Sequence, residues 1–433
     1  MAPMSRTPVY NVKAVVRETG LTPDLLRAWE RRYGVPLPQR SPGGHRLYSQ
    51  RDIELLKWLV ARKREGLNIS HAIELWENMA ERGLEPAPPR GIPAATAAPG
   101  SGSPDALRDA WVSRCLAFDE QGAEFVLSQG FSMHTPEIVA TEVLQRGLTT
   151  VDERWYHGET SVQQIYFASQ LAVRRLDALL DATPTPTRPA RVLLGCPPGE
   201  QHTFGSQLLS LLLRRQGWDV LYLGANLPLD RLEQTLADTR PNLVVLSAQQ
   251  LFTAATLVGM AEAVARAGFA VAYGGRIFNL APSLRRRVHG HFLGERLPEA
   301  PAKIEGLIYG APELTPPELS SEAYREALIH YRLRQPLIEA DLRQTASAGA
   351  PDRQHVEAHT YLTRGLEAAL ALGDMCLLDG EVDWLQGLLA HRHLPDLALR
   401  QYLAQHHRAA TAHLAEPGRT VVDWLAQTLE RLN

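Results

Sequence analysis

Cysteine is scarce in this sequence, which contains only Cys115, Cys196 and Cys376 among its 433 residues. Because the three lie far apart, the sequence indicates neither a disulfide framework nor a CxxC metal site. The chain also lacks any run of about 18 uncharged apolar residues. Its first residues, MAPMSRTPVYNVKAVV, lack the apolar core of a signal peptide. These absences predict a cytoplasmic protein with no membrane partner.

Positive charge is concentrated near the N-terminus, although the whole chain has a net charge of −3. Residues 1–64 contain 13 Lys and Arg against 5 Asp and Glu, a local net charge of +8. A basic stretch of this kind predicts a polyanionic partner for this segment alone. The alternative is a small helical domain with a solvated arginine face.

Proline-rich breaks divide the chain into regions. Residues 86–104 (PAPPRGIPAATAAPGSGSP) lack apolar periodicity and are predicted to form a flexible linker, while TPTPTRP (183–189) predicts a tight connection. A multidomain α and α/β protein is therefore expected. The predicted folded regions are residues 1–85, 105–182, 189–308 and 321–433.

The first region is predicted to contain a helix, a turn and a second helix. In VYNVKAVVRETGLTPDLLRAWERRYG, Gly20 separates two stretches of helical apolar spacing, and Thr22 can cap the second. The second helix of such a motif enters the major groove of DNA. The segment PLPQRSPGGHRLYSQRDI then predicts a β-hairpin wing against phosphates.

The stretches TGLTPDLLRAWERRYG and RSPGGHRLYSQRDI resemble the MerR family of winged-helix transcription regulators. The resemblance implies binding as a dimer to a palindromic, double-stranded operator, with Arg27 and Arg31 near the major groove. Arginine contacts to phosphate would make the affinity salt-dependent. The residues expected at DNA are Thr22, Arg27, Arg31, Tyr33, Arg40, His45, Arg46 and Tyr48.

Residues 105–182 contain four stretches of helical apolar spacing and predict an antiparallel four-helix bundle. The stretches are 105–117, 119–130, 134–156 and 160–180. Trp155 lies near the end of the third stretch, just before Gly158. Taken alone, this tryptophan predicts an aromatic residue in the core or at the rim of the bundle.

Residues 190–308 alternate five short apolar runs with helical stretches. Continuous rather than alternating strand hydrophobicity predicts a parallel, doubly wound sheet. Ligands of such sheets bind beyond the carboxyl ends of the strands. The loop PPGEQHTFG (197–205) follows the first strand, so His202 is expected at this edge. A capping or hydrogen-bonding role is the alternative for this histidine.

His202 belongs to a set of polar and small residues expected at the same edge. The others are Glu200, Gly205, Ser247, Gly274 and Gly275. Their pattern resembles the cobalamin-binding domain in which a histidine is the lower cobalt ligand. The resemblance implies that His202 ligates cobalt and that Ser247 contacts the nucleotide tail. Imidazole suits cobalt, and a carboxylate such as Glu200 can orient the ring.

The order of the N-terminal winged-helix domain (the head, residues 1–85), the bundle and the cobalamin domain resembles that of the CarH-type light-dependent repressors, in which the bundle covers adenosylcobalamin. In ERWYHGETSVQQIYFAS, Trp155 falls on the family's tryptophan. The resemblance implies an oligomer, either a dimer or a tetramer. This oligomer would bind operator in the dark and disperse in light. Ile165 and Tyr166 stand where the family has Glu-His, and a phenol with a pKa of about 10 ligates poorly near neutral pH. A different upper group, another tetrapyrrole or no cofactor are the alternatives.

The last region, 321–433, has helical apolar spacing and resembles no family known to us. We expect an oligomerisation or second sensing module. The favoured function is a repressor controlled by cobalamin, and the protein is predicted not to be an enzyme. One alternative is a MerR-type regulator whose degenerate cobalamin domain binds another tetrapyrrole or only protein partners. A corrinoid methyl carrier, similar to the module of methionine synthase, is the other.

Overall fold

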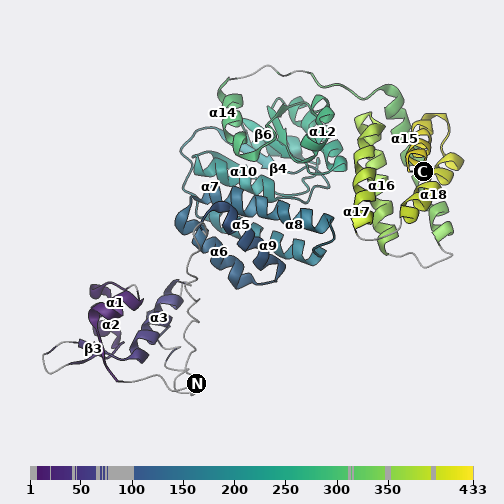
Figure 1. Ribbon diagram of the computed structural model, residues 1–433. Coiled ribbons are helices and arrows are strands. Elements are labelled where there is room, and N and C mark those ends of the chain that lie inside the picture. The colour runs from purple at the N-terminus through teal and green to yellow at the C-terminus, as the bar shows by residue number, and fades with distance from the viewer. Residues whose placement is uncertain are drawn as a thin grey trace. The chain divides into compact units, whose positions relative to one another are not determined.

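The computed structural model describes most of the chain. The described residues are 7–19, 21–40, 44, 46–64, 69–70, 72–73, 76, 102–310, 314, 316–346, 353–391 and 396–432. Their contacts define two compact units, Met1–Pro99 and Gly100–Asn433 (Figure 1). Of the predicted linker, only residues 102–104 lie within the described part.

The first unit is a helix-turn-helix with a small antiparallel sheet. Its helices are α1 (Val12–Thr19), α2 (Pro23–Tyr33) and α3 (Gln50–Arg64). The strands β1 (Tyr10–Asn11), β2 (Gln39–Arg40) and β3 (Arg46–Tyr48) pair in the order β1-β3-β2. The Thr22 side chain caps α2 by accepting from the Leu25 amide at 3.3 Å. The predicted helices and hairpin are present, whereas β1 is an additional strand.

The four-helix bundle begins the second unit. It consists of α5 (Pro104–Leu116), α6 (Glu120–Met133), a third helix and α9 (Val162–Asp181). The third helix runs through α7 (Pro136–Ile138), the π-helical η1 (Val139–Gln145) and α8 (Arg146–Tyr156). Apolar side chains at helical spacing on these helices form one core. The sequence prediction of a four-helix bundle is therefore confirmed.

A five-stranded parallel sheet follows, in the order β5-β4-β6-β7-β8. Its strands are β4 (Arg191–Gly195), β5 (Asp219–Tyr222), β6 (Leu243–Ser247), β7 (Val271–Gly274) and β8 (His291–Phe292). The winding direction reverses between the neighbours β4 and β6, where ligands of open α/β sheets bind. The predicted parallel, doubly wound sheet is confirmed.

Helices cover both faces of this sheet. Apolar residues of α10 (Phe204–Arg215) and α14 (Ala300–Gly310) pack on one face. On the other face lie α11 (Leu232–Thr239) and α12 (Leu251–Arg266). The short α13 (Ile277–Leu280) and the 3-10 helix η2 (Pro282–Arg287) connect β7 to β8. The loops that follow β4, β6 and β7 all lie at the carboxyl edge, because the strands are parallel.

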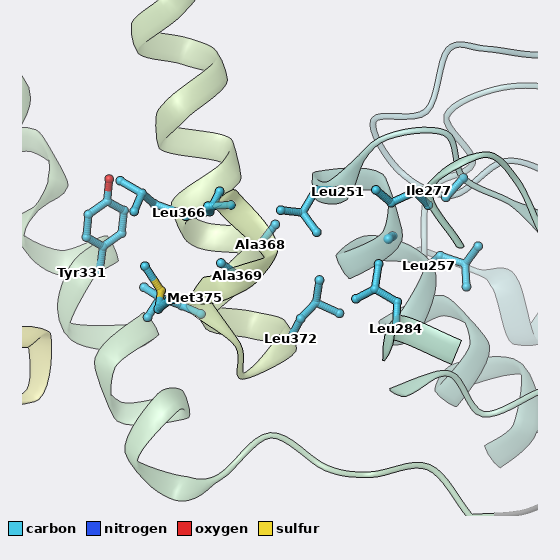
Figure 2. Packing of buried hydrophobic residues seen from close by; sticks show 14 of the residues in the cluster. Leu251, Leu257, Ile277, Leu284, Tyr331, Leu366, Ala368, Ala369, Leu372 and Met375 are labelled. Carbon is cyan, nitrogen blue, oxygen red and sulfur yellow. The ribbon is translucent and has the colours of Figure 1, made fainter. Parts of the chain in front are cut away.

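The C-terminal module, residues 322–431, is helical as predicted. It comprises α15 (Glu322–Ala346), α16 (Arg353–Leu372), α17 (Asp379–His391), α18 (Asp396–His413) and α19 (Arg419–Arg431). Figure 2 shows Ala368 and Leu372 of this module on the side of Leu251 and Leu284 of the sheet domain, while Leu366 lies beside Tyr331 within the module. The module and the sheet domain share one apolar core. No helix in the described part of the chain is long and apolar enough to cross a membrane.

Candidate functional site

The exposed face of α2 carries the basic residues expected at DNA. Arg27 and Arg31 are both exposed and, four residues apart, lie on the same side of the helix. Thr22 is exposed at the start of α2, and Arg40 is exposed on β2, while Tyr33 is half-buried. This arrangement offers two guanidinium groups on the second helix and one on the wing. Such a surface suits the phosphate backbone and base edges of DNA.

Tyr48 lies in a different place from the one expected. Its side chain is 0% exposed, and its hydroxyl donates to Glu30 Oε1 at 2.5 Å. Arg46 Nε donates to the other oxygen of the same carboxylate at 3.0 Å. The expectation that Tyr48 contacts DNA is therefore wrong, because its ring and hydroxyl hold β3 against α2. His45 lies outside the described residues.

At the carboxyl edge of the sheet, a buried carboxylate organises the loop after β4. Glu200 is 0% exposed, and its Oε1 accepts from the His202 backbone amide at 2.9 Å and lies 2.7 Å from His202 Nδ1. Its Oε2 accepts from the Gln249 amide and the Thr253 hydroxyl, each at 2.7 Å. Glu200 thus joins the loops after β4 and β6 across the switch point of the sheet.

The same hydrogen bonds shift the pKa values of the pair. Desolvation by burial opposes ionisation of Glu200, but hydrogen bonds from His202, Thr253 and two backbone amides lower the pKa of its carboxyl. The hydrogen bond to Glu200 raises the pKa of His202 in spite of desolvation. With Nδ1 held by the carboxylate, Nε2 is the nitrogen left for a ligand, and the imidazole side chain is 59% exposed.

The ends of β6 and β7 lie beside this pair. Ser247 is in register with Gly274. The Gln249 side chain donates to the Ser247 hydroxyl at 3.0 Å and accepts from the Arg276 amide at 3.0 Å, so it bridges the two strand ends. Gly275 has a φ of +121°, and a Cβ there would lie 1.9 Å from the Ala248 carbonyl oxygen. Only glycine fits that turn.

Two of the expected glycines border open space. A Cβ built on Gly274 would meet no atom within 4 Å, and one on Gly205 would meet only Leu297 Cδ1 at 3.9 Å. The structure therefore brings Glu200, His202 and Ser247 to one edge together with both glycines. In the described residues, no group of three or more His, Cys, Asp or Glu side chains is arranged to hold a metal ion.

Across from the sheet edge, α8 supplies Asp152 and Trp155. The Asp152 carboxylate interacts electrostatically with His202 and with Arg276, while desolvation raises its pKa. Trp155 is half-buried. On α9, Ile165 packs against the bundle core and Tyr166 is 67% exposed. Direct contact of these two residues with a cofactor stays a prediction.

The sequence reasoning missed several residues of this site. Thr253 forms a capping arrangement with Gln250 at the start of α12, and that spacing in the sequence could have revealed it. The sequence indicated no role for Gln249, yet its side chain links Ser247 to Arg276. Asp152 had no sequence signal, because it approaches His202 only after the bundle packs on the sheet.

Comparison with known families and proteins adds a second line of support. Residues 10–78 match the MerR HTH family regulatory protein family, and residues 107–180 and 190–296 each match a B12 binding domain. The HTH-type transcriptional repressor CarH of Myxococcus xanthus is 34% identical over 244 residues, which are 55% of this chain and 78% of CarH. The repressor CarA of the same organism is 33% identical over 240 residues, 54% of this chain and 75% of CarA.

Among solved structures, the monomethylamine corrinoid protein of Methanosarcina barkeri is similar with a TM-score of 0.37 and 19% identity. The match covers 46% of this chain and 95% of that protein. None of the three family matches extends beyond residue 296.

Proposed function

The chain belongs to the family of MerR-type transcriptional repressors that includes CarH and CarA, and from this we propose that it represses transcription under the control of bound cobalamin. The observation that carries the proposal is the Glu200–His202 pair at the switch point of the sheet. A buried carboxylate fixes the ring through Nδ1, which leaves Nε2 for a metal. Action on operator DNA would place the protein in the cytoplasm.

The residues at the sheet edge fit a cobalamin. His202 offers one accessible imidazole, and in the described residues no further His, Cys or carboxylate groups gather into a separate metal site. The space beside Gly274 leaves room that a side chain would fill. We propose His202 as the lower axial ligand, with Gly205, Ser247, Gly274 and Gly275 around the nucleotide tail. A bound corrin would supply the cobalt that this imidazole would coordinate.

On the bundle side, we propose that Trp155 faces the cofactor, with Ile165 and Tyr166 nearby. Adenosylcobalamin is the proposed form, and a response to light is part of the proposal. At the DNA, Arg27, Arg31 and Arg40 would contact the operator, with Thr22, Tyr33 and Arg46 supporting them. A dimer or tetramer is the proposed binding unit, because HTH proteins read two half-sites through two copies of the head.

A titration of the full-length protein tests the ligand. We expect adenosylcobalamin and hydroxocobalamin to bind and the absorption spectrum to report a histidine ligand. His202→Ala should abolish that spectral signature. His289→Ala is the matched control, since His289 precedes β8 and so lies at the amino-terminal edge of the sheet, away from the site. Uptake of a different tetrapyrrole, or of none, would contradict the proposed cofactor.

Gel shifts with operator DNA test the control of repression. We expect binding to change between cobalamin-free and adenosylcobalamin-loaded protein, and between dark and light. Unchanged binding in all four conditions would overturn ligand control and favour a regulator that answers to protein partners. Methyl transfer from a bound corrinoid at enzymatic rates would favour the carrier enzyme instead.

A further inference from the structure

Helix α17 of the C-terminal module lies against the end of α8. The Trp384 ring centroid is 6.1 Å from that of Trp155 and 5.9 Å from that of Tyr156, on which it stacks. His391 Nε2 lies 3.2 Å from His157 Nδ1. A Cβ on Gly387 would lie only 2.0 Å from the Tyr156 hydroxyl oxygen, so a glycine allows the two helices to approach this closely.

The module also reaches the charged residues of the sheet edge. Arg276, directly after Gly275, interacts electrostatically with Asp152 of the bundle, with His202 and with Tyr361 of α16. Tyr361 in turn hydrogen-bonds to Glu381 of α17. Arg276 is thus shared by all three parts of the second unit. One turn along α17 from Glu381, Trp384 contacts α8, so one face of α17 meets both Tyr361 of α16 and the bundle.

Asp152 of the bundle and His202 of the sheet edge are open to solvent, although protein lies close to both side chains. Both residues are exposed, yet desolvation by surrounding protein acts on both side chains. A ligand can therefore reach this pair from solvent. Asp152 belongs to the bundle and His202 to the sheet edge, and Arg276, which interacts with both, also interacts with Tyr361 of the module.

We propose that the C-terminal module forms a third wall of the ligand site, in which Trp384 holds Trp155 and Tyr156 in place while Tyr361, with Glu381 behind it, lies beside Arg276. This inference rests on the proposed cobalamin site at His202. Trp384 is a positioning residue, because it acts through Trp155 and Tyr156. The wall retains the ligand, so separating α17 from α8 opens the site and speeds release.

Two glycines on α17 provide a matched test in the full-length chain. Gly387→Leu drives a side chain into Tyr156, whereas Gly380→Leu places the same side chain where a Cβ meets nothing within 4 Å. Trp384→Ala removes the aromatic ring, and Trp384→Phe keeps a ring there. Each protein is loaded with hydroxocobalamin, and release is followed by absorbance after transfer to an excess of a second, ligand-free cobalamin-binding protein. Near-UV circular dichroism reports the pairing of Trp155 with Trp384 without ligand.

We expect Gly387→Leu and Trp384→Ala to release cobalamin about tenfold faster, since changes within one binding site act mostly on dissociation. Gly380→Leu should match the wild type, and Trp384→Phe should restore most of the retention. If both disruptive variants abolish the dichroism signal of the tryptophan pair yet release cobalamin at the wild-type rate, the wall is overturned while the cobalamin site stands. A wild type that binds no cobalamin would overturn the proposed function and the wall together.

Discussion

The Glu200 carboxylate is completely buried and lies 2.7 Å from His202 Nδ1, so the ring that faces the open edge of the sheet is fixed from behind. The same carboxylate also accepts from the Gln249 amide and the Thr253 hydroxyl. The orientation of the proposed ligand is therefore coupled to the junction between β6 and α12.

Glu200→Gln should weaken cobalamin binding by about 10- to 100-fold, because the amide keeps the shape but loses the charge that orients and polarises the imidazole. It should also lower the pKa of His202, since the hydrogen bond to Glu200 is the first cause of its elevation. An absorbance titration measures the affinity, and NMR of the histidine measures the pKa. Glu295→Gln, at an exposed carboxylate, is the control. Unchanged affinity would contradict the orienting role.

Gly274 and Gly275 are adjacent but should respond differently to alanine. Gly275→Ala places a Cβ 1.9 Å from the Ala248 carbonyl oxygen at a φ of +121°, so we expect a loss of about 2–3 kcal/mol in stability. In Gly274→Ala the new Cβ meets no atom within 4 Å, so the fold should tolerate the substitution. The methyl group would nevertheless fill space proposed for the ligand. Thermal unfolding and cobalamin titration separate the two effects. Equal stability of both variants would contradict this account.

Arg27→Ala and Arg31→Ala should each weaken operator binding and reduce the slope of log affinity against log salt concentration by about 1 for each phosphate contact removed. Tyr48→Phe should leave that slope unchanged, because its hydroxyl is bound to Glu30 in the interior. It should instead lower the stability of the head by about 1–3 kcal/mol, since it leaves a charged acceptor with one partner fewer. A salt slope that falls in Tyr48→Phe would show that Tyr48 does contact DNA.

The sequence allowed prediction of those parts of the site whose residues are close along the chain or at strand ends. Glu200 and His202 lie in one loop after a buried strand, so the rule that parallel strands share a carboxyl edge placed them correctly. The strand order itself, and with it the switch point beside β4, depends on packing and was seen only in the structure. The same reason explains Tyr48, whose partner Glu30 lies on another element.

The contact between the C-terminal module and the bundle was beyond prediction. Trp155 and Trp384 are far apart in the sequence, and nothing in either helix indicates the other. The apolar spacing of the C-terminal module predicted helices, but an apolar face does not reveal its partner. Here that partner is α12, which buries residues against both the sheet and α16. A second sensing or oligomerisation role for this module stays a prediction.

Glu381 should make the stability of the C-terminal module decrease as the pH rises. Burial raises the pKa of its carboxyl to about 7, although the hydrogen bond from Tyr361 opposes this. Because the pKa in the unfolded chain is lower, near 4.5, the folded state holds more protons between these values. With respect to this group, stability is therefore highest below about pH 4.5. It decreases as the pH rises toward 7. Above pH 7 the carboxyl is ionised in the folded state, so stability is lowered by the whole free-energy cost of a buried charge.

Glu381→Gln removes that charge and should raise the free energy of unfolding at pH 8 by about 1–3 kcal/mol, with a smaller effect at pH 5. Thermal unfolding of the full chain at pH 5, 6, 7 and 8 measures the difference between variant and wild type at each pH. Glu326→Gln, an exposed glutamate of the same module, should show no such pH dependence. A Glu381→Gln variant whose stability differs from that of the wild type by the same amount at every pH would mean that the pKa of Glu381 does not rise on folding, and that this carboxyl is not the source of the pH dependence.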